Sequence, residues 1–300
     1  MHEEPLVSII INCFNGEKYL RHAIESIISQ TYKNWEIIFW DNRSNDKSAK
    51  IFKEYKDDRL KYYLASSHIE ILYKARNLAL EKANGEFVAF LDVDDWWLPE
   101  KLEKQIPLFN DPDVGMVYGN LWLFFEKKNK KRIYKKKKLP TGKILNKLLN
   151  DYAIGSPTYV IRKKSLESLE FYFNDNFHII GDFDINIRLS VNWKIDCIQS
   201  PIAFVRRHDK NISKLNREKE IYELKTWFKQ MKNNQLISSQ NNFKKVILMT
   251  HYLETMQSIM ENGFVKSFLL VAKYPFSFNK MKLTLALLLP NLLLRKIKNY

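Results

Sequence analysis

Short apolar runs alternate with amphipathic segments along the first part of the chain. Leu6–Cys13 and Trp35–Trp40 are almost continuously apolar, as expected for parallel strands covered on both faces. Between them, apolar residues recur at helical spacing over residues 19–28, which predicts an amphipathic helix. Further strands are predicted at Leu60–Leu64 and Phe87–Leu91. This alternation predicts a doubly wound α/β sheet with crossover helices.

The pattern continues less regularly in the second part of the chain. Strands are predicted at 114–118, 158–161 and 198–205, with a further apolar run at 121–125. Residues 214–252 have the composition of long charged helices. We therefore predict a first domain at residues 1–213 and a helical C-terminal region at 214–300.

The end of the chain is apolar and basic. After Lys282 the run to Leu294 is free of charge for only about a dozen residues, whereas a transmembrane helix needs about 20. Two interpretations remain open. The segment could lie in the interface of a membrane, flanked by basic side chains, or form a helix packed against the rest of the protein.

Composition limits the class of protein. With 300 residues, 45% hydrophobic and 14% aromatic, the chain can bury a substantial core and is globular. Cys13 and Cys197 lie in apolar runs without metal-type spacing, so both are predicted to be buried free thiols in a reducing compartment. Residues 1–5 lack the regions of a signal peptide, which predicts a cytoplasmic protein.

The chain carries a formal net charge of +15. Such a charge predicts an anionic partner, which could be membrane lipid, a nucleotide or nucleic acid. Lysine and arginine are densest at residues 126–138. This segment is either a solvated hairpin or loop, or a patch attracted to an anionic membrane surface.

Three carboxylates directly follow the strand at 87–91. Asp92, Asp94 and Asp95 lie within four positions and would repel one another unless a cation lies among them. Mg²⁺ or Mn²⁺ is the natural candidate, because hard divalent ions prefer oxygen ligands. Alternatively, Asp94 or Asp95 caps the helix that starts near Leu98.

Polar residues also follow the first two strands, at Asn12–Asn15 and Asp41. In a doubly wound sheet the carboxyl ends of the strands line one crevice, so these residues can converge with Asp92 and Asp94. The crevice is then acidic. This argues against nucleic acid as a partner, because carboxylates repel phosphates unless a metal bridges them.

With these residues assembled, the chain resembles the family 2 glycosyltransferases, which have the GT-A fold. The motifs that carry the resemblance are Val7–Asn15, Ser29–Tyr32, Trp40–Asp46, Ala75–Asn77 and Phe90–Trp97 with Pro99–Leu102. Weaker similarity at Gly181–Asp184 and Arg207–Ser213 extends it to about residue 213. The resemblance implies a mixed doubly wound sheet with flanking helices, to which the helical C-terminal region is appended.

The resemblance further implies a nucleotide-sugar donor, commonly a UDP-sugar, and inversion at the anomeric carbon. It assigns Asp41 to the nucleobase, Asp92 to the ribose or the metal, and Asp94 with His208 to a Mn²⁺ or Mg²⁺ ion. The residues it assigns to the donor are Asn12, Phe14, Asn15, Asp41, Arg76, Asp92 and Val93. For Arg76, a surface position on a helix remains an alternative, as a structural role does for His208.

Asp182 matches the general base of the family, and Asp184 is the reserve candidate. Asp95 and Trp97 are predicted to face the acceptor, the alternatives being a helix cap and packing beneath the next helix. The chain departs from the family pattern at Asn42 and Arg43, where aspartate and glycine are usual. It also has Gly181 where an acidic residue is usual.

We therefore predict a metal-dependent inverting glycosyltransferase that acts on a hydroxyl of a glycan acceptor. The acceptor implied by the resemblance and the basic, apolar tail is a lipid-linked glycan, with the enzyme peripheral at the inner face of the plasma membrane. Two alternatives remain. One is a noncatalytic protein that binds anionic membranes on a degenerate GT-A scaffold. The other is a sugar-nucleotide pyrophosphorylase, although residues 13–17 lack its glycine-rich phosphate loop.

Overall fold

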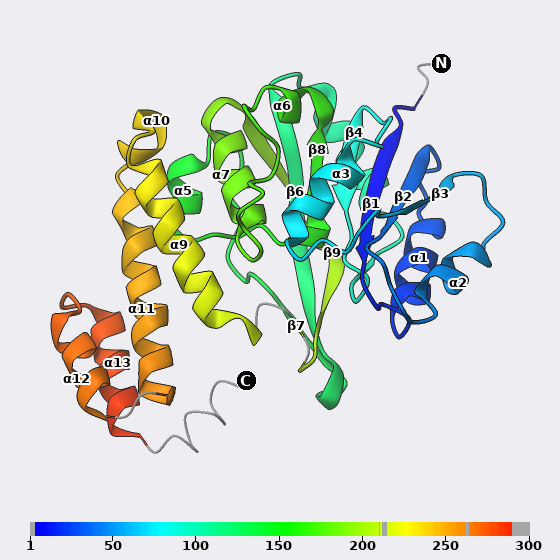
Figure 1. Ribbon diagram of the computed structural model, residues 1–300. Helices are drawn as coiled ribbons and strands as arrows, with labels where there is room; N and C mark the ends of the chain where they lie inside the picture. Colours follow the sequence, from blue (N-terminus) through cyan, green and yellow to red (C-terminus); the bar gives the residue numbers. More distant parts are fainter. Residues whose placement is uncertain (1–3, 210, 212–214, 262–263, 290–300) are drawn as a thin grey trace. The chain divides into compact units, whose positions relative to one another are not determined.

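The computed structural model describes residues 4–209, 211, 215–261 and 264–289 (Figure 1). The chain divides into two compact units, Met1–Asn211 and Ile212–Tyr300. The domain boundary predicted at residues 213 and 214 lies outside the described residues, as does the end of the apolar run beyond residue 289.

A 9-stranded mixed sheet forms the first unit, in the order β3-β2-β1-β4-β8-β6-β9-β5, with β7 paired to β6. Its parallel half consists of β1 (Val7–Cys13), β2 (Trp35–Asp41), β3 (Leu60–Leu64) and β4 (Phe87–Phe90). The helices between these strands are α1 (Leu20–Ile28), α2 (Ser48–Lys53) and α3 (Leu72–Leu80). The alternation predicted from the apolar runs is therefore observed.

The other half of the sheet is mixed. It contains β5 (Trp96–Trp97), β6 (Val114–Phe125), β7 (Lys130–Ile133), β8 (Val160–Arg162) and β9 (Lys194–Arg207). β8 runs antiparallel to β4 and β6, while β9 is parallel to β6. The two apolar runs predicted as separate segments form the single strand β6. A side chain at Gly119 would lie 2.5 Å from Ile202, so the glycine allows β6 to continue close beside β9.

Further helices accompany the mixed half. They are α4 (Lys101–Gln105), α5 (Leu145–Asn150), α6 (Lys163–Glu167) and α7 (Gly181–Asn192), with 3-10 turns at Ile106–Asn110, Glu126–Lys128 and Ser156–Thr158. The main core lies between α1 and the sheet, where Ala23 and Ile27 pack with strand residues such as Ile9. Cys13 and Cys197 are free and buried, as predicted.

The basic segment at 126–138 forms a hairpin. β7 is antiparallel to the end of β6, and its lysines are exposed. The ammonium nitrogen of Lys131 lies 4.7 Å from the centroid of the Trp122 ring, which is a cation–π contact at the surface. The predicted hairpin is observed, with its lysines at the surface.

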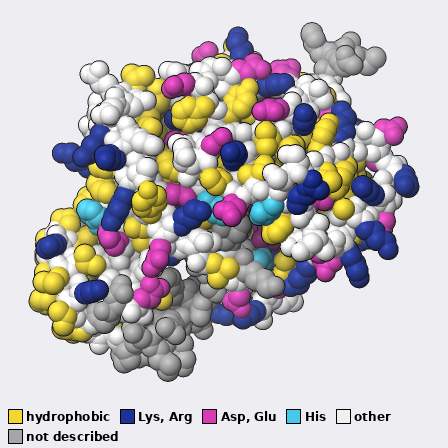
Figure 2. All heavy atoms as spheres, in the orientation of Figure 1, with side chains coloured by type: hydrophobic (Ala, Val, Ile, Leu, Met, Phe, Trp, Pro, Cys, Tyr) yellow, Lys and Arg dark blue, Asp and Glu magenta, His cyan; other side chains and the backbone are white. Residues whose placement is uncertain are grey.

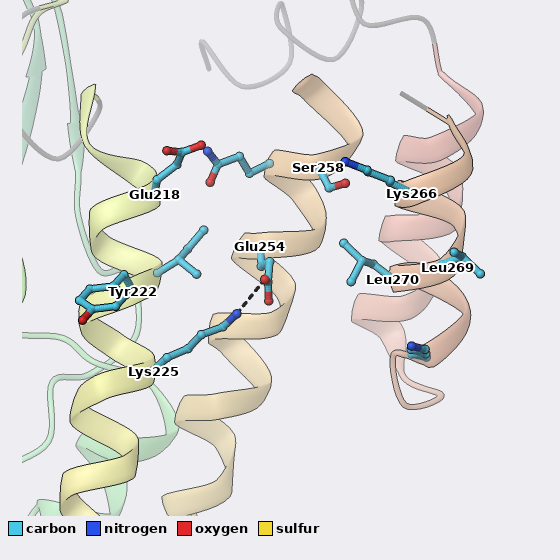
Figure 3. A pocket seen from close by; sticks show the side chains of 11 residues that line it. Glu218, Tyr222, Lys225, Glu254, Ser258, Lys266, Leu269 and Leu270 are labelled. Carbon is cyan, nitrogen blue, oxygen red and sulfur yellow. Dashed lines mark hydrogen bonds and ion pairs between the residues drawn. The ribbon is translucent and has the colours of Figure 1, made fainter. Parts of the chain in front are cut away.

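The second unit is helical. Its helices are α9 (Arg217–Met231), α10 (Gln235–Ser238), α11 (Phe243–Glu261), α12 (Phe264–Lys273) and α13 (Phe278–Leu288). A groove of about 570 Å³ runs between α9, α11 and α12, and an ion pair of 2.7 Å between Lys225 and Glu254 crosses it (Figure 3). Among the described helices, none combines the length and apolar character needed to cross a bilayer.

Candidate active site

A buried arginine joins two of the predicted site carboxylates. Arg76 lies on α3, and its side chain is only 2% exposed. Its guanidinium pairs with Oδ1 of Asp92 at 2.5 Å and with Oδ1 of Asp182 at 3.0 Å. The alternative of a surface arginine is therefore wrong. Burial opposes the charge, but the carboxylates of Asp92 and Asp182 outweigh it and raise the pKa of Arg76 above its ordinary value.

Asp182 lies in the first turn of α7 with its side chain 18% exposed. The hydroxyl of Tyr159 donates a second hydrogen bond to the same Oδ1, at 2.5 Å. Burial and the charge of Asp182 raise the pKa of Tyr159 far above its ordinary value, so this hydroxyl keeps its proton and donates. Among the described residues, none donates a hydrogen bond to Oδ2 of Asp182.

The main chain of Asp182 is fixed as well. Its carbonyl oxygen accepts from the hydroxyl of Tyr152 at 3.3 Å, and that hydroxyl accepts from Asn186 at 2.8 Å. Sequence reasoning missed both Tyr152 and Tyr159, because neither belongs to a motif. The signal for Tyr159 is only its place in the run predicted as a strand at 158–161; in the structure it directly precedes β8.

Gly181 has a packing explanation. A Cβ at this position would lie 2.4 Å from the ring of Tyr73 on α3. The acidic residue usual in the family therefore does not fit here, because α7 starts directly against this ring. Asp184, the reserve candidate for the base, is 1% exposed and pairs with Arg188 at 2.8 Å. Its carboxylate is buried and accepts from Arg188, one turn further along the same helix.

Asp94 and His208 lie together, although 114 positions separate them. Oδ2 of Asp94 is 3.0 Å from Nε2 of His208, and the side-chain amide of Asn211 donates to the same oxygen at 3.2 Å. The ring of Tyr19 stacks on His208 with 5.3 Å between centroids. The side chains of Asp94 and His208 remain partly accessible, at 23% and 12%.

The Asp94–His208 pair fits a divalent cation. Mg²⁺ and Mn²⁺ are commonly held by one or two protein ligands while substrate phosphates and water complete the shell. A carboxylate oxygen and an imidazole nitrogen 3.0 Å apart would supply such a half-site. Within the described part of the chain, no group of three or more His, Cys, Asp or Glu side chains forms a complete metal cage.

Asp41, the last residue of β2, is buried. Asp41 is 1% exposed, its Oδ1 accepts from the main-chain N–H of Ser44 at 2.7 Å, and its Oδ2 accepts from the hydroxyl of Tyr62 at 2.7 Å. Both oxygens are thus engaged. The exposed group beside it is Phe14, which is 50% exposed and lies 4.3 Å from the ring of His68.

Other predicted donor residues lie at or just after the carboxyl ends of β1 and β4. The side-chain oxygen of Asn15 accepts from the N–H of Asn45 at 2.9 Å, which connects the loops after β1 and β2. The amide group of Asn12 is buried without a hydrogen-bond partner among the described residues. Val93 packs partly buried against the main core. His68 was not predicted, because a lone histidine in a loop carries no motif.

Asp95 and Trp97 lie in the interior. Asp95 is 5% exposed and accepts from the N–H of Arg206 at 2.9 Å, which ties the carboxylate turn to β9. Burial raises the pKa of Asp95 well above its ordinary value. Trp97 is 2% exposed and belongs to the main core. Its ring is therefore packed in the interior, as in the alternative to an acceptor contact. Neither Asp94 nor Asp95 caps α4, which has Glu100 at its N-cap.

Comparison with protein families places these residues in context. The family model described as "Glycosyl transferase family 2" matches residues 8–169. An Escherichia coli protein, the UDP-Glc:alpha-D-GlcNAc-diphosphoundecaprenol beta-1,3-glucosyltransferase WfgD, is 36% identical over 171 residues. That match covers 57% of this chain and 66% of the relative. Two further curated relatives are matched over only 47% of their own length.

Solved structures show the same fold. S. aureus TarS 1-349 in complex with UDP-GlcNAc superposes with a TM-score of 0.68 at 18% identity, covering 90% of this chain and 81% of that one. A mannosyltransferase from Pyrobaculum calidifontis in complex with GDP-Man and Mn²⁺ gives 0.65 at 14% identity, covering 99% and 88%. The predicted GT-A type of mixed α/β sheet is confirmed.

Proposed function

Because the chain belongs to glycosyl transferase family 2, we propose that it is an inverting transferase that moves a sugar from a nucleoside diphosphate to an acceptor hydroxyl. The observation that carries this proposal is the bridge from Arg76 to both Asp92 and Asp182. The guanidinium of Arg76 pairs with Asp92, a proposed donor residue, and with Asp182, the candidate base, so the two carboxylates are held close together. Such an arrangement suits a reaction in which donor and acceptor must be aligned.

Asp182 is proposed as the general base. Its Oδ1 is occupied by Arg76 and Tyr159, so Oδ2 is the atom that would receive the proton of the acceptor hydroxyl. Two hydrogen bonds to one oxygen fix the plane of the carboxylate, which orients the other oxygen. A base held in this way favours attack by a single acceptor hydroxyl from the face opposite the leaving group, as inversion requires.

Asp94 and His208 are proposed to hold Mn²⁺ or Mg²⁺ together with the donor diphosphate. When bound, the cation would neutralise negative charge that develops on the leaving nucleoside diphosphate. The surrounding residues keep this half-site in place. Asn211 donates to Asp94, and Tyr19 packs on the face of His208.

A uridine nucleotide is the proposed donor. The E. coli relative uses a UDP-sugar by its name, and TarS was solved with UDP-GlcNAc. Phe14 is exposed at the end of β1 beside His68, where an aromatic ring can stack on a base. Because both oxygens of Asp41 are engaged, we propose that Asp41 shapes the loop around the base instead of contacting it through a free oxygen.

The proposed acceptor is a glycan on a lipid diphosphate, in the synthesis of a surface polysaccharide or glycoconjugate. This rests on the E. coli relative, whose name specifies a diphosphoundecaprenol acceptor. Which hydroxyl is glycosylated depends on loops that are specific to this chain. A pyrophosphorylase gains no support, because the matched family consists of glycosyltransferases.

The proposal is tested with the full chain and a panel of nucleotide sugars, by following nucleoside diphosphate release with Mn²⁺. We expect turnover with at least one UDP-sugar. Asp182→Asn should abolish transfer while binding of the donor, measured by calorimetry, stays within about twofold. Asp58→Asn changes an exposed carboxylate elsewhere on the unit and is the matched control.

The same panel distinguishes the alternatives. Absence of turnover with every donor, together with retained vesicle binding, would favour the noncatalytic protein. Retained turnover in Asp182→Asn would remove Asp182 as the base while leaving the transferase assignment intact.

A further inference from the structure

The helix α12 buries Ser267 beside Val271 and leaves several apolar side chains exposed. Ser267 is fully buried, and its hydroxyl lies 3.1 Å from that of Ser258 on α11. The adjacent Phe268 and Leu269 are 52% and 54% exposed. A helix that faces water normally shows the opposite pattern, with apolar residues inward and serine outward. The outer side of α12 is therefore suited to an apolar environment.

Apolar side chains are exposed along α13 as well. Leu283 is fully buried in the small core of this unit, whereas Met281, Leu285 and Leu288 are 53%, 63% and 70% exposed. Phe276, in the turn between the two helices, is 90% exposed. Hydrophobic side chains gather over this part of the molecule (Figure 2, lower left). Apolar surface of this extent marks a site of interaction.

Charge identifies the kind of partner. The last acidic residue of the chain is Glu261, and the 39 residues after it contain seven Lys and Arg. Among them, Lys266, Lys273 and Lys282 lie on α12 and α13 themselves. Exposed aromatic and aliphatic residues interspersed with lysines, without carboxylates, match the interface of an anionic bilayer.

A second copy of the chain fits this surface less well. A symmetric dimer would place each patch against its own copy, so the lysines of one chain would face those of the other. No carboxylate after Glu261 is present to neutralise them. An anionic bilayer supplies both the apolar layer and the missing negative charge.

We propose that the exposed apolar residues of α12, α13 and their connecting turn insert into the headgroup region of an anionic membrane. This inference deepens the proposed function, since a lipid-linked acceptor lies in a membrane, but its evidence is independent of the transfer site. The residues that would enter the bilayer are Phe264, Phe268, Leu269, Phe276, Leu285 and Leu288.

The test is co-sedimentation of the full chain with vesicles of phosphatidylcholine, with and without phosphatidylglycerol. We expect binding to the mixed vesicles that weakens with salt. Phe268→Ser combined with Leu285→Ser should weaken it about tenfold or more, because two partly exposed side chains no longer enter the bilayer. Lys266→Gln with Lys282→Gln should cost about fivefold for each lysine.

Matched controls use residues of the same unit outside this surface. Leu236→Ser with Met249→Ser replaces side chains that are 60% and 50% exposed, on α10 and α11. Lys229→Gln with Lys244→Gln removes the same charge from α9 and α11. Both control pairs should bind as the unchanged chain does. Circular dichroism of every variant verifies that the helices are retained.

The outcomes separate this proposal from the proposed function. Failure of the full chain to bind mixed vesicles at low salt would overturn membrane docking, whereas donor turnover measured without vesicles would be unaffected. Equal losses in the α12–α13 variants and the controls would also overturn it. A dimer in light scattering that only Phe268→Ser with Leu285→Ser dissociates, without vesicle binding, would assign the surface to a second copy.

Discussion

The guanidinium of Arg76 donates to Oδ1 of Asp182 at 3.0 Å, although 106 positions separate the two residues. The same group pairs with Asp92, so a single buried cation balances two carboxylates from different elements. Removing one partner of such a group leaves charge without compensation, which costs far more than the loss of a surface ion pair.

Arg76→Met should therefore destabilise the protein and abolish transfer. We expect a loss of ~2–4 kcal/mol in the free energy of unfolding, because Asp182 stays mostly covered while Asp92 retains some access to water. Urea denaturation measures it. Arg76→Lys should recover part of the stability but little activity, since an ammonium group lacks the planar fork that reaches both carboxylates. Full activity in Arg76→Lys would contradict the bridging role.

Tyr159→Phe removes one of the two hydrogen bonds to Asp182. A hydrogen bond to a charged group contributes about 1.5–3 kcal/mol, so kcat should fall by about ten- to a hundredfold, with little change in KM for the donor. Steady-state kinetics measures both parameters. Tyr63→Phe, on β3, is the control and should be neutral. A change in donor KM alone would place Tyr159 in donor binding instead.

Chelation of divalent ions should weaken UDP binding by about tenfold or more, because the diphosphate would lose its main positive partner. Calorimetry with Mn²⁺ and then with excess chelator measures this. Uridine, which lacks the diphosphate, should bind equally under both conditions. Asp94→Asn should reproduce the effect of the chelator, and UDP affinity that is insensitive to both would exclude the Asp94–His208 pair as a metal half-site.

Lys101→Met should stabilise the protein. Lys101 is fully buried, and its ammonium nitrogen has no hydrogen-bond partner among the described residues, lying only over the ring of Trp97 at 3.9 Å. Burial lowers its pKa well below the ordinary value of 10.5. Between the two pKa values the unfolded chain binds the extra proton, so the lysine opposes folding most at low pH.

The gain from Lys101→Met is expected to be about 2–4 kcal/mol at neutral pH and to shrink as the pH rises toward the unfolded pKa of lysine. Thermal or urea unfolding across this pH range tests the sign. A gain that grows with pH would indicate that the lysine is charged and stabilising in the folded protein.

The sequence was sufficient for the parallel half of the sheet. Continuous apolar runs followed by polar residues marked β1, β2 and β4, and strand topology then brought Asp92 and Asp94 to the same edge. The mixed half was harder. Its strands run in both directions, and β6 joins two runs that Gly119 and Asn120 separate in the sequence.

The contacts that each site side chain makes could not be predicted from the sequence in this way. Helical spacing does not distinguish a buried Arg76 from a surface one, because its partners come from the turn after β4 and from α7. The contact of Tyr159 with Asp182 on α7 and that of Tyr62 on β3 with Asp41 on β2 likewise depend on tertiary packing. The motif located Asp182, whereas its hydrogen bonds depend on tertiary structure.

Asp41 is buried, and both of its carboxylate oxygens accept hydrogen bonds from the protein. Its two oxygens fix the loop after β2 through Ser44 and Tyr62, while Phe14 and His68 form the accessible surface nearby. The group that maintains the loop is thus separate from the groups a nucleobase would meet. Substitutions at Phe14 and His68 offer a route to enzymes that accept other nucleotide sugars without loss of the scaffold.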